Sequence, residues 1–252
     1  MADNINELAT LSVLRVKQYP RVFKYLTYDS GIKMLECNNL QFTRADQLND
    51  KEDCHISKIN FDFVRATEDV LKLDQNELVS KIKNKDTKPI SSFGICSFGT
   101  SADNDILWRR YTKTNEVYDG ICIELDREAI FKCLIERKIK FVSFVVDYID
   151  KTVESIPYEY RIGDNEGIKL MFLSRLFATK TKAEWEDEEE LRIILTEELS
   201  EVYWREELDK ICFKRIYLGN EMTTKQRNNI LRIVEEAKYK MGICNYDKTL
   251  RY

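Results

Sequence analysis

Short alternating or β-branched segments predict strands along this chain, and apolar residues at helical spacing predict helices between them. Strands are expected at residues 23–27, 40–43, 93–98, 120–125, 141–148, 188–195, 211–218 and 243–246. Helices are expected at residues 30–37, 105–113, 126–138, 168–179 and 224–242, and two more are expected within residues 59–84, with a break near Asp74. The two kinds of element mix without a strict β-α-β rhythm, so the pattern predicts an α+β fold: a mixed or antiparallel central sheet with flanking helices.

The chain shows no internal repeat, no low-complexity tract and no linker rich in Gly, Ser or Pro. We therefore expect a single domain over residues 1–252. It should include an N-terminal arm at residues 1–20, a helical insertion near residues 59–88, and a C-terminal helix with a short strand at residues 223–252. Asp29 or Ser30 is expected to cap the start of the first helix, and Asp126 the start of the helix at residues 126–138. Thr223 or Thr224 is expected to cap the start of the last helix, and Gly242 to end it.

The stretch Trp185–Leu195 joins an acidic run to a short apolar strand. Alternate side chains of a strand share a face, so the apolar residues are expected to point into the core. Glu188, Glu190 and Arg192 are expected to share the other face, beside the ring of Trp185. Two carboxylates and a guanidinium in one row make this stretch the best candidate for a functional site. The alternative is that the acidic run is only the solvated entrance to a strand.

Composition excludes several kinds of chemistry. Charged residues make up 33% of the chain with a formal net charge of -4, so there is no global basic field to attract nucleic acid. His55 is the single histidine, which excludes multi-histidine metal sites and leaves one residue for any histidine-based triad. Walker and GxGxxG phosphate-binding motifs are absent from the sequence.

The expected compartment is a reducing cytoplasm. Seven widely spaced cysteines without a CxxC pair argue against a disulfide framework and against a structural zinc site. Residues 1–4 lack the apolar core of a signal peptide, and no uncharged run approaches the length of a membrane span. We therefore expect a cytoplasmic protein with no membrane association.

Four segments, taken in order, resemble a bacterial family known only as domain of unknown function 2971. They are Phe23–Tyr25, Leu40–Cys54 with its Asn49-Asp50 loop, Ile95–Glu124 with its Leu107–Tyr111 block, and the Trp-x-x-Glu-x-Glu-x-Arg pattern of Trp185–Arg192. The fourth segment has Leu191 where the family has an aromatic residue. The resemblance covers roughly residues 21 to 220. It implies a bacterial protein, often from mobile or defence-associated gene neighbourhoods, and no settled activity.

A second resemblance is to the ADP-ribosyltransferases. These enzymes combine an Arg or His on a first strand, a Ser- or Thr-bearing strand, and a Glu that opens a later strand, often in a Glu-x-Glu motif. The similar residues here follow the same order: Lys24, Tyr25 and Thr27, then Ser97, then Glu188 and Glu190. Lys24 departs from the usual Arg or His. The resemblance implies an NAD-consuming bacterial effector or toxin that acts in anti-phage defence.

The resemblance also implies roles for individual residues. Glu190 would be the catalytic carboxylate and would stabilise the oxocarbenium-like transition state formed when the nicotinamide bond breaks. Glu188 would orient the acceptor, a protein or a nucleic acid. The remaining roles are pairing with the pyrophosphate for Lys24 or Arg192, holding a ribose for Ser97 or Thr27, and stacking on a ring for Tyr25 or Tyr111. The chemistry needs no metal, and a partner protein or antitoxin could neutralise the effector.

Two other classes of function stay open from the sequence. In a Mg²⁺-dependent nuclease or phosphodiesterase, Asp50 and Asp53 would join Glu188 and Glu190 around the metal, with Lys180 or Lys182 near the phosphate. In a non-catalytic sensor or interaction domain, the same motifs would serve the core. The transferase hypothesis requires six residues to converge on one cleft: Lys24, Tyr25, Ser97, Tyr111, Glu188 and Glu190.

Overall fold

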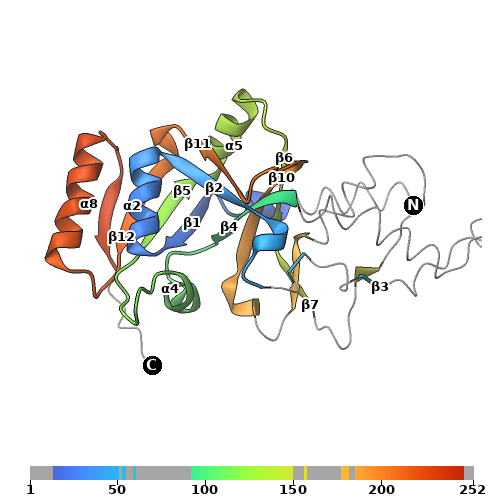
Figure 1. Ribbon diagram of the computed structural model, residues 1–252, viewed down its shortest axis with the longest axis horizontal. Coiled ribbons are helices and arrows are strands. Elements are labelled where there is room, and N and C mark those ends of the chain that lie inside the picture. The colour runs from blue at the N-terminus through green and yellow to red at the C-terminus, as the bar shows by residue number, and fades with distance from the viewer. Residues whose placement is uncertain are drawn as a thin grey trace, which may run out of the picture.

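The computed structural model describes residues 14–50, 53–54, 59–60, 92–149, 156–157, 177–181 and 185–246. These residues form an α+β fold in which helices flank a large, mostly antiparallel sheet, as the sequence predicts (Figure 1). Among them, no helix is both long enough and apolar enough to cross a membrane.

The main sheet has nine strands. In chain order they are β1 (Arg21–Leu26), β2 (Asn39–Arg44), β4 (Phe93–Gly99), β5 (Ile121–Asp126), β6 (Phe141–Val145), β10 (Glu190–Glu198), β11 (Tyr203–Glu207), β12 (Phe213–Leu218) and β13 (Gly242–Asn245). Their spatial order is β11-β2-β4-β1-β5-β12-β13, and β10 pairs with both β4 and β6. Two small parallel pairs lie outside this sheet: β3 (Ile59–Asn60) with β8 (Ile156–Pro157), and β7 (Asp147–Ile149) with β9 (Thr179–Thr181).

The sheet forks at β4. One edge of β4 pairs with β10 from Gly99 back to Phe93. The other edge is shared, because β2 pairs with its start at Gly94 and Ile95 while β1 pairs with its end at Gly99. Between these points β1 and β2 diverge and leave a stretch of the β4 backbone without a neighbouring strand. A buried backbone carbonyl needs another donor there, and the Lys24 ammonium supplies it by donating to the Ser97 carbonyl at 2.8 Å.

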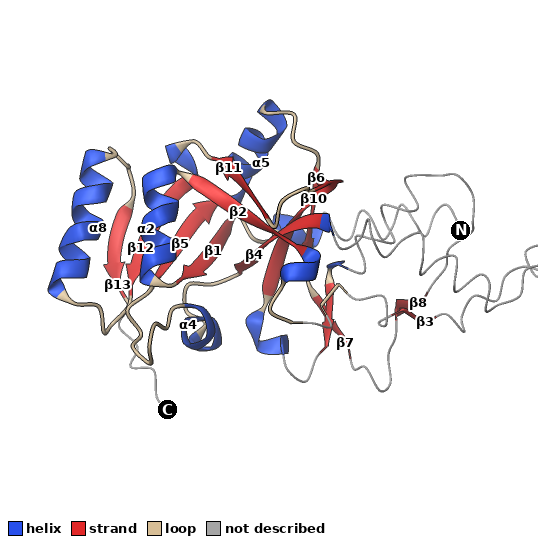
Figure 2. Cartoon of the chain, viewed as in Figure 1, coloured by secondary structure: helices blue, strands red, loops and turns tan. Residues whose placement is uncertain are grey.

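In the described part of the chain, four helices pack around the sheet: α2 (Tyr28–Cys37), α4 (Asp105–Tyr111), α5 (Arg127–Glu136) and α8 (Thr224–Glu236). Helices α2 and α8 lie side by side, whereas α4 lies below β1 and β4 in the view of Figure 2. The main core joins fully buried strand residues such as Val22, Ile123 and Leu191 with Leu35 of α2 and Ile230 of α8. A smaller aromatic cluster around Trp108 packs α4 against β1.

Some of the predicted helix ends are confirmed. Asp126 caps α5 by accepting a hydrogen bond from the Ala129 amide at 3.0 Å, and Thr223 caps α8 in a capping box with Gln226. The prediction for α2 is wrong, because Thr27 precedes its first turn and Asp29 lies inside the helix.

Other boundaries differ from the prediction for local reasons. Helix α8 ends at Glu236, and Gly242 begins β13 instead of ending the helix. Residues Ile59–Asn60 form a strand where a helix was expected, and the rest of the predicted insertion lies outside the described residues. Likewise, residues 168–176 of the expected helix lie outside them, and Thr179 begins β9. Strand β11 was not predicted, because its sequence Tyr-Trp-Arg-Glu-Glu carries no apolar alternation.

Candidate active site in the fork of the sheet

A pocket of about 360 Å³ lies in the fork between β1, β2 and β4. Its volume falls within the range of small-molecule sites. The residues that the transferase hypothesis requires all line it: Lys24, Tyr25, Ser97, Tyr111, Glu188 and Glu190, together with Arg192. Thr27 is not among its lining residues; its hydroxyl donates to Ser30 at the start of α2. The structure thus gathers all but one of the predicted residues, although their roles stay predictions.

Glu188 and Glu190 do not share one continuous strand face, because a sharp turn lies between them. Glu186–Glu188 form a 3₁₀ turn, Glu189 adopts a left-handed conformation with φ of 45°, and β10 begins at Glu190. The prediction that Glu188 lies on the strand is therefore wrong. Asn104 fixes the turn, because its side-chain amide donates to the Asp187 carbonyl at 2.7 Å while its side-chain oxygen caps α4.

Glu190 is a buried carboxylate held by two cations. One of its oxygens accepts from the Arg192 Nε at 2.6 Å, and the other lies 2.8 Å from the Lys180 ammonium. Its backbone amide donates to the Tyr148 hydroxyl of β7 at 3.0 Å, which fixes the start of the strand. Burial alone would raise the pKa of Glu190, but the charges of Arg192 and Lys180 lower this pKa by more than burial raises it. The net shift is therefore strongly downward. Glu190 is therefore a permanent anion at neutral pH.

Glu188 is equally buried and has three donors. Lys180 contacts one of its oxygens at 2.8 Å, while Arg110 and the Tyr111 hydroxyl donate to the other at 3.0 and 2.8 Å. The indole of Trp185 is packed against both cations, with Lys180 4.5 Å and Arg110 4.6 Å from its ring centre. Trp185, which was expected beside the acidic run, therefore packs against the two cations that pair with Glu188.

The guanidinium of Arg192 has its N–H donors engaged by protein groups, so it has none left for the pyrophosphate that it was predicted to bind. The side chain is 1% exposed, and its guanidinium donates to Glu190, to the Phe177 carbonyl at 2.6 Å and to both oxygens of Asp53. Although burial opposes the charge, Asp53 and Glu190 raise the pKa of Arg192 well above its usual value. In this geometry Arg192 orients Glu190, and the assignment to pyrophosphate is corrected.

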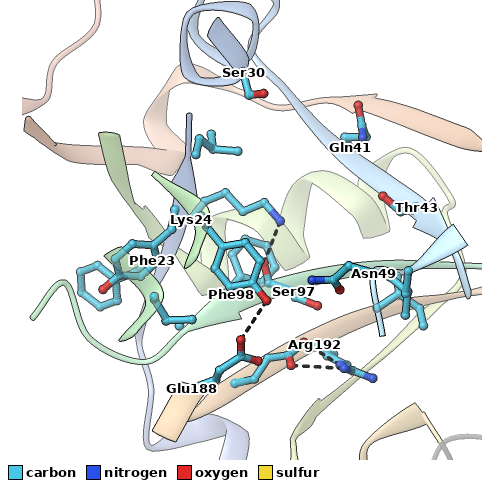
Figure 3. Close-up of a pocket in the computed structure, with 18 of the residues that line it drawn as sticks. Phe23, Lys24, Ser30, Gln41, Thr43, Asn49, Ser97, Phe98, Glu188 and Arg192 are labelled. Carbon is cyan, nitrogen blue, oxygen red and sulfur yellow. Dashed lines mark hydrogen bonds and ion pairs between the residues drawn. The ribbon is translucent and has the colours of Figure 1, made fainter. Parts of the chain in front are cut away.

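Cations also line the opposite wall of the pocket. Lys24 of β1, Lys33 of α2 and Arg205 of β11 all line it, and Lys33 and Arg205 are exposed. Figure 3 shows Ser30, Gln41 and Thr43 on this side, Glu188 and Arg192 on the other, and the Lys24–Ser97 contact between them. Arg205 donates to the Gln41 side chain at 2.9 Å. Lys33 and Arg205 were not predicted from the sequence, because neither lies in a recognisable motif.

The two tyrosines differ in how far they can serve a ligand. The Tyr25 side chain is buried, its hydroxyl donates to the Ser101 carbonyl at 2.6 Å, and its ring meets Trp108 edge-on. Its ring therefore belongs to the core, and the stacking role predicted for it is not supported. Tyr111 is tied to Glu188, and burial together with the Glu188 charge raises the pKa of its hydroxyl. Phe23 also lines the pocket and was not singled out from the sequence.

The arrangement does not favour the metal-dependent alternative. Asp53 does approach the glutamates, but Arg192 separates it from Glu190, and Lys180 lies 3.9 Å from one of its oxygens. Ammonium and guanidinium groups therefore occupy the space between these carboxylates. Within the described ranges no set of His, Cys, Asp or Glu residues is arranged to hold a metal ion.

Comparison with known proteins yields only distant structural similarity. No family model and no curated protein matches the chain, so the resemblance to domain of unknown function 2971 stays a prediction. Among solved structures, the chain is similar to DarT of Thermus sp. 2.9 in complex with NAD+, with 10% identity over 93% of this chain and 98% of that chain and a TM-score of 0.38. The same protein in complex with ADP-ribosylated ssDNA gives 9% identity over 93% and 97% and a TM-score of 0.39. Both scores lie below 0.5, so the function is argued from the residues of the site.

Proposed function

We propose that this protein is an NAD-consuming, ADP-ribosyltransferase-like enzyme that breaks the bond between nicotinamide and ribose. The observation that supports this most is the placement of a permanently ionised carboxylate, Glu190, at one wall of a pocket whose other wall carries cations. A molecule with a ribose at one end of a pyrophosphate suits this arrangement, because a ribose hydroxyl can donate to the carboxylate while the pyrophosphate lies against the cations of the other wall.

The charge state of Glu190 narrows the chemistry. Hydrolysis of an ordinary glycoside needs a carboxylic acid with a raised pKa to protonate the leaving oxygen. The pKa of Glu190 is lowered instead, so this residue is suited to stabilise positive charge and not to donate a proton. The nicotinamide of NAD already carries a positive charge and leaves as a neutral ring, so its departure needs no acid.

Glu190 and Glu188 can each accept one more hydrogen bond, which a substrate hydroxyl could donate. A carboxylate can accept about four hydrogen bonds. Glu190 accepts from Lys180 and twice from Arg192, and Glu188 accepts from Lys180, Arg110 and Tyr111. In the proposed complex Glu190 takes the 2-hydroxyl of the nicotinamide ribose, and Glu188 orients the acceptor.

The pyrophosphate is assigned to the cationic wall. Lys24, Lys33 and Arg205 replace Arg192 in this role, since Arg192 is fully engaged with buried carboxylates. Ser97 lies at the fork beside Lys24 and is assigned to a ribose. The acceptor is a protein or a nucleic acid. The setting in bacterial anti-phage defence and a neutralising partner protein are proposed on the family resemblance alone, whereas the cytoplasmic location is proposed on the cysteine pattern.

NAD and NADH together test the proposal. They share both riboses and the pyrophosphate, but the reduced ring of NADH has no positive charge and is a poor leaving group. We expect both to bind in isothermal titration calorimetry and only NAD to release its ring in a chromatographic assay. Equal cleavage of the two would contradict the leaving-group argument, and failure of both to bind would contradict the assignment of the pocket.

A further inference from the structure

Lys180 occupies the centre of the buried charge cluster. Its ammonium lies 2.8 Å from an oxygen of Glu188 and 2.8 Å from an oxygen of Glu190, so these two oxygens are at most twice 2.8 Å apart. The side chain is 4% exposed and comes from β9, outside the main sheet. Burying a lysine this deeply is costly unless the charge is paired, and here it is paired with both candidate catalytic carboxylates at once.

Without this ammonium the two carboxylates would repel each other. The cluster contains three buried acids, Asp53, Glu188 and Glu190, and three cations, Arg110, Lys180 and Arg192. Arg110 pairs with Glu188, and Arg192 pairs with Glu190 and Asp53. Lys180 pairs with both glutamates and therefore bridges them. Two like charges this close in a buried site raise the pKa of one of them unless a positive charge lies between them.

We infer that Lys180 is a positioning residue that joins Glu188 to Glu190 and fixes the distance between the two carboxylates. This deepens the proposed function and rests on it as far as catalysis is concerned. The charge pairing itself is independent of which substrate binds. No contact of Lys180 with a reacting atom is implied.

The groups that face Lys180 come from several elements. Besides the three carboxylates, they are Arg192 on β10, the Trp185 ring, the Tyr148 hydroxyl on β7 and the Tyr111 hydroxyl on α4. Burial would lower the pKa of Lys180, but Glu190, Asp53 and Glu188 raise it, so the ammonium keeps its charge at neutral pH. The hydroxyls stay protonated there, since burial raises the pKa of both. The Glu190 carboxyl, whose pKa Lys180 helps to lower, is therefore the group whose protonation should respond to loss of Lys180.

The test replaces Lys180 by Met, which keeps the length of the side chain and removes its charge. In ¹³C NMR of the folded variant, we expect the Glu190 carboxyl to titrate at a higher pH than in the wild type, because one of the two charges that lower its pKa is removed. If NAD is cleaved, the rate of the variant should begin to fall at a higher pH than the rate of the wild type when the pH is lowered. Lys140→Met, which removes an exposed partner of Glu197, is the matched control and should change neither readout.

A glutamate titration unchanged in Lys180→Met overturns the inference, whether or not NAD is a substrate. A shifted titration with no NAD cleavage by the wild type leaves the inference intact and contradicts the proposed function. If the Met variant does not fold, Lys180→Arg carries the test, because it keeps the charge on a longer and wider group. We expect that variant to retain the wild-type pH profile and to lose at least about tenfold in kcat. Wild-type kcat in Lys180→Arg would overturn the positioning role.

Discussion

At the scale of single residues, the site is a row of buried charges, and the sequence indicates about half of it. The Glu-x-Glu-x-Arg spacing identifies Glu188, Glu190 and Arg192, although only Glu190 and Arg192 lie on the predicted strand. The sequence places Asp53 and Lys180 near the two glutamates only in the metal-dependent alternative, and not as ion-pair partners. Asp53 in particular comes from a distant segment that only the folded chain brings close to Arg192. The sequence also does not indicate which cations are free for a ligand, since that depends on burial.

The pKa of Glu190 makes a prediction about stability. Its pKa in the folded protein lies below the ordinary value of 4.5, because Arg192 and Lys180 outweigh the effect of burial. The ion pairs therefore stabilise the fold fully above about pH 5 and lose their contribution as the pH falls through the lowered value. In urea unfolding between about pH 5 and pH 3, we expect the free energy of unfolding to fall less steeply in Glu190→Gln than in the wild type.

Asp187→Asn is the matched control for that measurement. Asp187 belongs to the same acidic run, but its side chain is exposed, so its removal should leave the slope unchanged. Identical slopes in the wild type and in Glu190→Gln would show that Glu190 is not held as a paired anion.

At the scale of elements, the local apolar pattern predicts most strands. It fails where a turn interrupts the pattern and where a strand lies at the edge of the sheet. Strands β1, β2, β4, β5 and β12 agree with the alternating apolar segments that predicted them. The start of β10 was misplaced because the left-handed Glu189 interrupts the alternation within a run of like residues. Strand β11 was missed because it is an edge strand of exposed polar and aromatic residues, which has no hydrophobic face to reveal it.

Asn104 connects two elements and gives a second prediction. Asn104→Ala removes the cap of α4 and the hydrogen bond that holds the acidic turn. Thr223→Ala removes a comparable cap from α8. Loss of either cap should destabilise the protein by about 0.5–2 kcal/mol in thermal or urea unfolding. Of these two variants, only Asn104→Ala should also slow nicotinamide release, because Asn104, unlike Thr223, bonds to the turn that carries Glu188. Equal slowing in both variants would reduce the role of Asn104 to general stability.

At the scale of the whole molecule, the α+β class is confirmed, but the strand order could not be predicted. Pairing of β4 with β1, β2 and β10 joins segments far apart in sequence, and nothing local specifies such partners. The fork that results creates the pocket, because diverging strands leave both space and an unpaired backbone edge, to which Lys24 bonds. The predicted residues converge at the fork because of the strand topology. Their motifs, in contrast, can be recognised in the sequence alone.

The most direct test of the account is release of nicotinamide from NAD, measured for the purified wild type, Glu190→Gln and Asp187→Asn. The Gln variant keeps the shape of the side chain and removes the charge that stabilises the transition state, so we expect its rate to fall by about 100-fold or more. Asp187→Asn should release nicotinamide within about twofold of the wild-type rate, as expected for an exposed surface change. Release that is equally fast in Glu190→Gln would contradict the account, because the bond would then break without the carboxylate on which the proposed chemistry depends.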